Sequence, residues 1–166
     1  MPDPEAPTNE DSHAPASHSV EETRTVDERA NHCFGCGPLN PEGLHLKFVV
    51  DSADPGSITA SAIVELTRVH EGPPGYLHGG IIATLMDEAM SKLNRPLNLL
   101  AMTRNLEVDY IRPAPLKTPL RLTSRHLKRD GRKLFHVAEL SGLDGTVLAR
   151  AKGFFLVIDA AMLTRT

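Results

Sequence analysis

The sequence predicts an α+β fold, in which a curved antiparallel sheet of about six strands wraps around one long central helix. Three observations predict it. Stretches of alternating apolar and polar residues, typical of strands, surround a single segment of helical period. Two such stretches precede this segment and four follow it, so helix and strands are segregated along the chain. Asp-Gly pairs, which favour hairpin turns, separate the last three stretches at Asp130-Gly131 and Asp144-Gly145.

The first two strands flank a turn at Asp54-Pro55-Gly56. Before the turn, Leu44, Leu46 and Phe48 lie at alternate positions, as expected when one face of a strand is buried. A rigid Gly-Pro-Pro-Gly connector at 72–75 then leads into the helical segment. The expected strands cover residues 44–50, 58–66, 102–111, 119–128, 133–141 and 146–158.

The expected helix runs from Gly80 to about Asn94, and Pro96 prevents its continuation. It is unusually apolar, so we expect the sheet to wrap it. Its apolar face consists of Ile81, Ile82, Leu85, Met86, Ala89 and Leu93. A core role is expected for four side chains that would also suit a tunnel for an apolar ligand: Leu85, Met86, Met90 and Leu93.

Charge divides the chain into two parts. Residues 1–28 hold eight acidic side chains and one basic side chain, a net charge of −7, and have few aliphatic residues. Such a composition predicts a disordered acidic tail, followed by one domain over residues 29–166. Since the whole chain carries −3, the remainder carries +4, which suits an anionic small molecule. With 4% aromatic residues and no Trp, it does not favour nucleic acid.

Location is expected to be cytoplasmic. No apolar run approaches the ~20 residues of a membrane-spanning helix. The first residues also lack the basic and apolar segments of a signal peptide, and they are too acidic for a transit peptide.

Candidate catalytic residues gather at the start of the helix. His78-Gly79-Gly80 places bare backbone N–H groups there, at the positive end of the helix dipole. About two turns later, Asp87 is an acid among apolar residues, on a narrow small or polar stripe with Gly80, Thr84 and Ser91. Amide donors beside a partly buried acid can polarise a carbonyl and activate water, which indicates a hydrolase. Alternatively, the glycines form only a tight turn and Asp87 lies in solvent beside Glu88.

Two further groups are candidates. In the strand after the helix, alternation places Thr103 on one face with Asn105, Glu107 and Asp109, which an exposed polar face would also explain. Basic residues cluster around the Asp130-Gly131 hairpin, either as a solvated surface or as phosphate contacts: Arg121, Arg125, Lys128, Arg129, Arg132 and Lys133.

Cys33 and Cys36 form a Cys-x-x-Cys pair. Two ordinary thiols in a turn are the favoured interpretation, ahead of half a zinc site and of a redox pair. A zinc site would need further ligands, from His32, His45 or the same pair of a second copy. We predict no metal at the catalytic residues.

Together, three blocks resemble the hotdog-fold acyl-CoA thioesterases of the phenylacetate-degradation (PaaI) type, including the thioesterase-superfamily members of animals. The blocks are Gly72 to Asp87, Thr103 to Pro113, and Gly131-Arg132-Lys133, and the similarity spans residues 43–158. It implies hydrolysis of an acyl-CoA to free acid and coenzyme A, within fatty acid metabolism. It also implies a homodimer or a dimer of dimers, with each site at a subunit interface.

The resemblance also implies roles for single residues. Asp87 is the general base or the nucleophile, and Thr103 helps to position the water. The N–H of Gly79 or Gly80 holds the thioester carbonyl, with His78 beside it. Arg132 and Lys133 contact the phosphates of coenzyme A, which is part of the substrate, so no separate cofactor is expected. Some relatives have an Asn at the position of Gly72. Any role of that side-chain amide is therefore absent here or is taken by another residue.

Two other functions remain open. A hotdog domain can bind acyl-CoA as a sensor or carrier without turnover, but such a protein needs neither Asp87 nor Thr103. A hydratase on the same fold would need a His near the helix carboxylate, and no such pattern is evident in the sequence.

Overall fold

The computed structural model describes residues 31–54 and 56–159. Its longer elements are one α-helix and six strands. In chain order they are β1 (Val49–Asp51), β2 (Thr59–Val64), α1 (Gly79–Ser91), β3 (Ala101–Tyr110), β4 (Leu120–Asp130), β5 (Lys133–Gly142) and β6 (Val147–Val157). Two 3-10 turns, η2 (Arg68–His70) and η3 (Lys92–Asn94), flank α1. The predicted order of strands and helix is confirmed, and the predicted tail at 1–28 lies outside the described residues.

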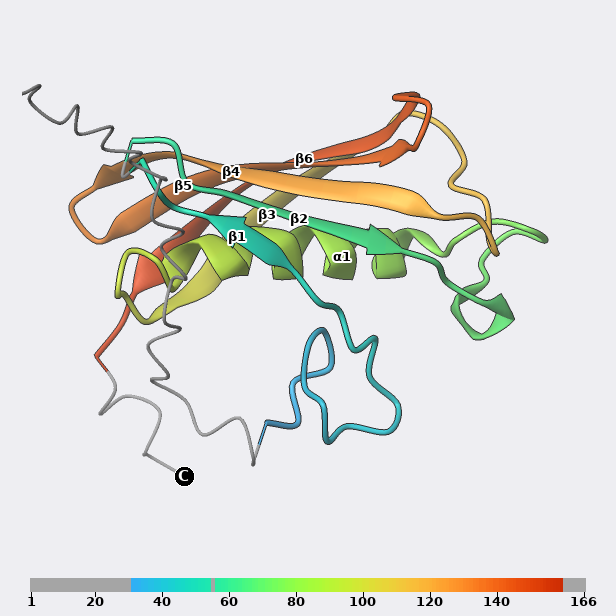
Figure 1. The fold of residues 1–166 in the computed structure, drawn as a ribbon, viewed down its shortest axis with the longest axis horizontal. Coiled ribbons are helices and arrows are strands. Elements are labelled where there is room, and N and C mark those ends of the chain that lie inside the picture. The colour runs from blue at the N-terminus through green and yellow to red at the C-terminus, as the bar shows by residue number, and fades with distance from the viewer. Residues whose placement is uncertain (1–30, 55, 160–166) are drawn as a thin grey trace, which may run out of the picture.

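All six strands form one antiparallel sheet in the order β1-β2-β4-β5-β6-β3 (Figure 1). The last three strands in sequence are joined by short turns at Gly131 and Gly145, whose φ angles of 56° and 86° favour glycine. β3 crosses over to pair with β6 and becomes one edge of the sheet. Within residues 31–54 and 56–159, no strand pairs with the other edge of β3, the strand that follows α1 in sequence.

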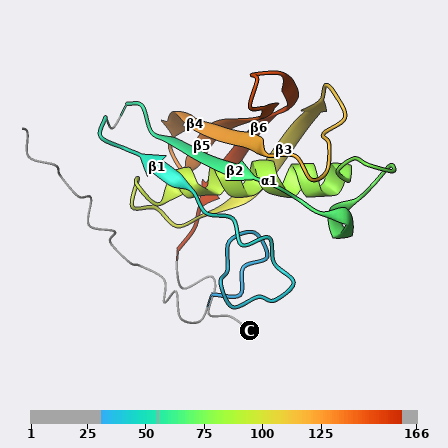
Figure 2. The same cartoon turned by 45° about the vertical axis from the view of Figure 1, so that its right-hand side comes forward.

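Helix α1 packs against one face of this curved sheet, and the two form the core (Figures 1 and 2). The four side chains expected in the core, Leu85, Met86, Met90 and Leu93, are all 0% exposed. A hydrogen bond of 2.6 Å from the buried Ser124 hydroxyl to the Ala89 carbonyl fixes α1 to β4. In the described part of the chain, no helix is long and apolar enough to cross a membrane.

The first strand is much shorter than predicted. Residues 44–50 were expected to form it, but β1 begins at Val49. His45 has a φ angle of 50°, which interrupts the extended backbone. The N–H groups of Leu44 and Leu46 donate instead to the carbonyls of Phe34 and Gly35. These bonds attach the strand's start to residues 31–43, here called the cysteine loop, which Figures 1 and 2 show on the side of α1 away from the sheet.

Candidate active site

The start of α1 leaves one backbone donor available. His78 is the N-cap residue, and its Nδ1 accepts the N–H of Gly80 at 2.9 Å. The N–H groups of Ile81 and Ile82 donate to the His78 carbonyl. Of the first N–H groups of the helix, that of Gly79 alone has no partner among the described residues. His78 thus supports the loop by capping, and Gly79 presents the free donor at the positive end of the helix.

Two contacts hold this end of the helix in place. The Tyr110 hydroxyl, at the end of β3, donates to the Gly79 carbonyl at 3.0 Å. On the preceding loop, Gly72 lies so close to His78 that an added Cβ would stand 2.9 Å from the His78 Cα. An Asn at position 72 would therefore require the capping residue to shift.

Asp87 is half-buried, and its carboxylate faces Thr103. The Thr103 hydroxyl donates to Asp87 Oδ1 at 2.6 Å, joining the middle of α1 to the start of β3. No Lys, Arg or His of the described residues forms an ion pair with Asp87. The carboxylate thus keeps a neutral hydrogen-bond partner and no neutralising cation. The alternative of a solvent-exposed Asp87 is wrong.

A β-bulge turns Thr103 toward the helix. The pairing of β3 with β6 shifts between Thr103 and Asn105, which leaves Arg104 as the extra residue. Thr103 pairs with the buried Phe155, and Tyr110 pairs with the buried Ala149. Thr103 therefore points to the same side as Tyr110, and its predicted placement on one face with Asn105, Glu107 and Asp109 is wrong. Strict alternation fails because the bulge adds one residue.

Burial raises the pKa of Asp87 above the ordinary value of 3.8. The hydrogen bond from Thr103 acts in the opposite direction, because it stabilises the ionised form, and the neighbouring charge of Glu88 raises the pKa further. A carboxylate with a raised pKa is a stronger base than an ordinary Asp, which suits proton abstraction from water.

Gly79 and Asp87 lie eight residues apart on the same helix. With a rise of ~1.5 Å per residue, their backbones are about 12 Å apart along the helix axis. A carbonyl held by the Gly79 N–H is therefore beyond the reach of a water activated by Asp87 of the same chain. One group lies at the first residue of the helix and the other near its middle, so they do not form one local cluster.

The basic residues do not form one cluster. Lys128, Arg129, Arg132 and Lys133 flank the β4–β5 hairpin, but Arg121 pairs with Ser141 at the other end of β4. Arg121 and Asp130 are nine residue steps apart along the strand, about 30 Å, so the expected place of Arg121 at the hairpin is wrong. The Arg132 guanidinium donates to the Val157 carbonyl at 2.8 and 3.0 Å. The Lys133 ammonium lies 5.8 Å from the centre of the Phe154 ring.

Other polar residues of the stripe on α1 bond to the helix itself. The Thr84 hydroxyl donates to the Gly80 carbonyl, and the Ser91 hydroxyl donates to the Glu88 carbonyl, both at 2.9 Å. Asp87 is the member of this stripe that reaches another element.

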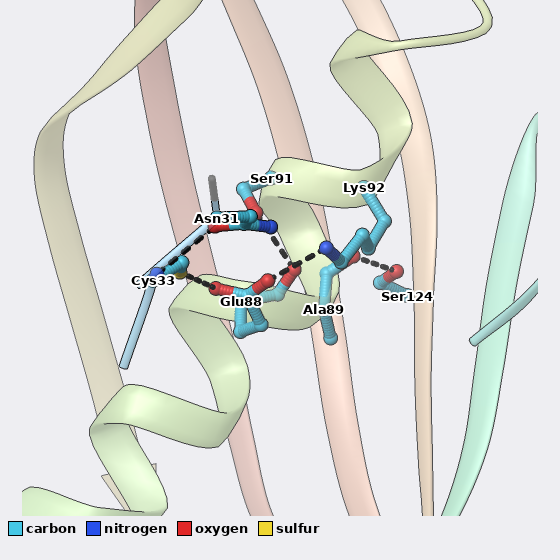
Figure 3. Close-up of polar contacts among 7 residues, drawn as sticks. All are labelled: Asn31, Cys33, Glu88, Ala89, Ser91, Lys92 and Ser124. Atoms are coloured by element: carbon cyan, nitrogen blue, oxygen red, sulfur yellow. Dashed lines mark hydrogen bonds and ion pairs between the residues drawn. The ribbon is translucent and has the colours of Figure 1, made fainter. Parts of the chain in front are cut away.

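Glu88 is a buried carboxylate that sequence reasoning did not select. It is 9% exposed, and its Oε1 lies 2.7 Å from the Lys92 Nζ. The thiol of Cys33 lies 3.7 Å from its Oε2 (Figure 3). Burial and then the contact with Glu88 raise the pKa of Cys36 to about 11. The Glu-Lys spacing of four residues is a sequence signal for the ion pair, but the approach of the cysteine loop is not readable from sequence.

Comparisons with known proteins agree with this fold. The sequence model of the thioesterase superfamily matches residues 74–149 of this chain, a range that includes α1 and β3. A thioesterase superfamily protein of known crystal structure has a TM-score of 0.66 and 32% sequence identity, and the match covers 87% of this chain and 73% of that one. The hotdog fold expected from the resemblance is confirmed.

Two further proteins are informative. Acyl-coenzyme A thioesterase THEM4 of Bos taurus is 36% identical over 90 residues, which are 54% of this chain but 37% of the bovine protein. This chain therefore spans well under half the length of that relative. A hypothetical thioesterase of Streptococcus pneumoniae TIGR4, solved with coenzyme A, has a TM-score of 0.58 at 15% identity, and the match covers 67% of this chain and 88% of that one. The likeness to the streptococcal protein concerns the fold alone.

Proposed function

Because the chain belongs to the thioesterase superfamily, we propose that it hydrolyses acyl-CoA thioesters to a free acid and coenzyme A. The observation that carries the proposal is the state of Asp87. This carboxylate is half-buried, has a raised pKa and no ion-pair partner in the described chain, and is oriented by Thr103. A structural carboxylate in such a position would need a cation to offset its desolvation.

The reaction needs a base and an oxyanion donor. Asp87 accepts a proton from water as the water oxygen attacks the thioester carbonyl carbon. The Gly79 N–H stabilises the negative charge that develops on the carbonyl oxygen. The C–S bond then breaks, the acyl group leaves as the acid, and the thiolate of coenzyme A takes up a proton. Direct attack by Asp87, through an anhydride that water opens, needs the same groups.

We place Gly79 and Asp87 of one site on two subunits. About 12 Å separates them along one helix, but Thr103 lies beside Asp87 and Tyr110 lies beside Gly79. A two-fold axis between Leu106 and Glu107, midway along this part of β3, would pair the free edges of two β3 strands antiparallel. Asp87 of one subunit would then face Gly79 of the partner subunit, and the dimer would contain two equivalent sites.

The surface near β3 supports this assembly. Large apolar side chains in and beside this edge strand are exposed: Leu100, Met102, Tyr110 and Ile111. An unpaired edge with such side chains is a surface that a second strand would cover. Two shallow hollows in the surface of the chain lie elsewhere, one over the outer face of β3 to β6 and one near Pro115 and Leu143. On assembly, the substrate cleft at Asp87 would lie between the two subunits.

Coenzyme A is expected to reach the β4–β5 hairpin through its phosphates. Lys133 is exposed there, and its ammonium is a suitable contact for phosphate. The Arg132 guanidinium already donates to the Val157 carbonyl. Arg132 therefore anchors the hairpin, and its charge can also face the nucleotide. The cytoplasmic location and the place in fatty acid metabolism stay predictions, which cell fractionation and the substrate panel below test.

The test is thiol release from short, medium, long and aromatic acyl-CoAs by the full chain and by Asp87→Asn. We expect hydrolysis of at least one of them and a loss on the order of a hundredfold or more in kcat for Asp87→Asn. Asp109→Asn is the matched control, because this exposed carboxylate lies beyond the bulge of β3. Near-full activity of Asp87→Asn would contradict the mechanism. Tight binding of acyl-CoA without hydrolysis would show a sensor or carrier instead.

Sedimentation at several protein concentrations tests the assembly. We expect a mass of at least twice the 18.1 kDa of the chain. Met102→Asp, which adds a charge in the exposed edge strand, should shift the distribution to monomers and abolish hydrolysis together. A fully active monomer would contradict the shared site.

A further inference from the structure

Cys33, Cys36 and Glu88 converge on one point between the cysteine loop and α1. Their ligand atoms, two sulfurs and a carboxylate oxygen, all lie within 4.8 Å of one another. Cys33 Sγ and Glu88 Oε2 are 3.7 Å apart. In a tetrahedral zinc site with Zn–S of ~2.3 Å and Zn–O of ~2.0–2.2 Å, the ligand atoms lie about 3.5–3.8 Å apart. The three groups therefore need to close by about 1 Å or less to share one ion.

The loop is shaped around the Glu88 carboxyl. Gly35, between the two cysteines, passes so close that an added Cβ would collide with this carboxyl group. Glu88 is itself 9% exposed, although it carries a charge. Buried carboxylates are paired or bind metal ions, because desolvation of an isolated charge is costly.

The two oxygens of Glu88 have separate partners. Oε1 is paired with the Lys92 ammonium at 2.7 Å, and Oε2 faces the Cys33 thiol. Figure 3 shows Glu88 between Cys33 on one side and Lys92 on the other. Ligating carboxylates are commonly held by an outer partner in this way, which fixes the orientation of the ligating oxygen.

We propose that Cys33, Cys36 and Glu88 bind one zinc ion, with Lys92 as the outer partner of Glu88 and a solvent molecule as the fourth ligand. On binding, each thiol loses its proton to solvent. Two thiolates, the carboxylate, Zn²⁺ and the Lys92 ammonium then sum to zero net charge. Cys33 is exposed, so the fourth position opens to water. The ion fastens the cysteine loop to α1 one residue beyond Asp87 and is independent of the proposed hydrolysis.

This donor set differs from the one that the sequence suggests. His32 and His45 are the nearest candidates along the chain, but neither joins the cluster. Glu88 is 55 residues away from Cys33 in sequence and becomes a ligand candidate only through the fold. The sequence alone favours ordinary thiols, because it contains no second Cys pair to complete four ligands.

The test is titration of the untagged, reduced full chain with Co²⁺ under nitrogen, and then displacement by Zn²⁺. We expect one equivalent per chain, with thiolate-to-cobalt absorption in the near ultraviolet and the strong visible bands of tetrahedral cobalt. The thiolate absorption distinguishes this site from cobalt held by any of the eight His of the chain. Cys33→Ser and Cys36→Ser should each weaken binding by at least about a hundredfold, and Glu88→Gln by about ten- to a hundredfold.

Glu42→Gln is the matched control, because this exposed carboxylate belongs to the same loop. It should bind like the wild type. One further measurement needs no variant: Zn²⁺ should protect both thiols of the wild-type chain from alkylation, counted by mass spectrometry. Three results would each overturn the proposal: no thiolate absorption, unchanged binding when Cys33→Ser and Cys36→Ser are combined in one chain, or alkylation unaffected by Zn²⁺. A Cys33–Cys36 disulfide that forms readily in air, without any metal binding by the reduced chain, would show a redox pair instead.

Discussion

Asp87 and Glu88 are consecutive carboxylates on α1, yet they have opposite surroundings. Asp87 faces the edge strand β3, where its partner is the neutral hydroxyl of Thr103. Glu88 faces the cysteine loop and is paired with the Lys92 ammonium. Among the described residues, one side of the helix therefore leaves a carboxylate charge without a cation, and the other side neutralises it.

Because of this difference, one carboxylate of the helix suits catalysis and the other contributes to the stability of the fold. Burial without a cation costs folding free energy but raises the pKa of Asp87, which benefits a base. Burial with a cation and two thiols makes Glu88 an attachment point for the cysteine loop. In the sequence the two residues are simply adjacent acids. Their roles differ because β3 lies against Asp87 and the cysteine loop lies against Glu88.

The largest effect should follow from loss of the Gly79 N–H, the proposed oxyanion donor. Gly79 is the first residue of α1, a position where Pro is well tolerated, and the extended ψ of 137° at His78 accommodates a following Pro. Gly79→Pro thus removes the N–H with little distortion. We expect kcat to fall by about 10²–10³-fold.

Gly79→Ala is the control for this change. It keeps the N–H, and its Cβ would stand 3.5 Å from the Tyr110 ring, an ordinary contact. Its thiol release should stay within a few-fold of wild type. Equal losses for the Ala and Pro variants would contradict the role of the N–H and indicate a steric requirement.

Substitution of the two carboxylates should separate activity from stability. Glu88→Gln leaves Lys92 without its ion pair, and we expect a loss of about 2 kcal/mol in the free energy of unfolding. This is below the ~3–5 kcal/mol of a fully buried pair, because the Lys92 side chain is 25% exposed. Asp87→Asn should keep the wild-type stability or gain up to about 1 kcal/mol, since it removes a desolvated charge. Urea unfolding measures both, and a reversed order would refute the comparison.

Activity should show the opposite order for the same pair of variants. Glu88→Gln should retain most of kcat, while Asp87→Asn loses it. If Glu88→Gln were as inactive as Asp87→Asn, the two sides of the helix would not have separate roles.

Thr103 should have a smaller effect, seen best in the pH profile. As a base, Asp87 must be ionised, so activity rises with pH through its pKa, which burial places above 3.8. Thr103→Val removes the hydrogen bond that lowers this pKa, so the inflection of kcat/KM should move to higher pH. We expect kcat to fall by about tenfold as the carboxylate loses its orientation. Thr103→Ser keeps the hydroxyl and should resemble the wild type.

Glu88→Gln should move the same inflection the other way. It removes the neighbouring charge that raises the pKa of Asp87, so the inflection should fall to lower pH. Shifts of both variants in one direction would contradict the assignment of the titrating group to Asp87.

The smallest effect is expected at the hairpin. Lys133→Ala should raise the KM for acyl-CoA by a few-fold, as expected from loss of one exposed phosphate contact. Its kcat for a pantetheine thioester, which lacks the nucleotide, should be unchanged. Arg129→Ala is the control, because the Arg129 guanidinium donates to the Gly131 carbonyl of the turn. A similar rise in KM for the pantetheine substrate would exclude a phosphate contact.

Much of the fold is predictable from the sequence because its signals are local. The apolar period of α1, the Asp-Gly turns and the alternation in β4 to β6 each lie within a few residues. Asp87 and Gly79 are also local features of one helix. The crossover of β3 to the sheet edge is not local, and the sequence analysis did not predict it. The resemblance to a family implied a dimer, and its pairing through β3 stays a proposal.

What the sequence did not predict depends on contacts between distant residues. The bulge at Thr103 reverses the face that alternation assigns, and nothing in the residues around it marks the extra position. Glu88 resembles a solvated helix residue until the cysteine loop covers it. His136 alternates like any core residue of β5, but the Asn94 that lies 3.0 Å from its Nε2 is 42 residues away.

The most direct test of the shared site mixes two inactive proteins. Asp87→Asn keeps the Gly79 donor, and Gly79→Pro keeps the Asp87 carboxylate. If each site takes one group from each subunit, a mixed dimer contains one intact site. Unfolding and refolding the two variants together should then restore about a quarter of the wild-type kcat per chain, because half of the dimers are mixed and half of their sites are intact. Activity no higher than that of the separate variants would contradict a site built by Gly79 of one subunit and Asp87 of its partner.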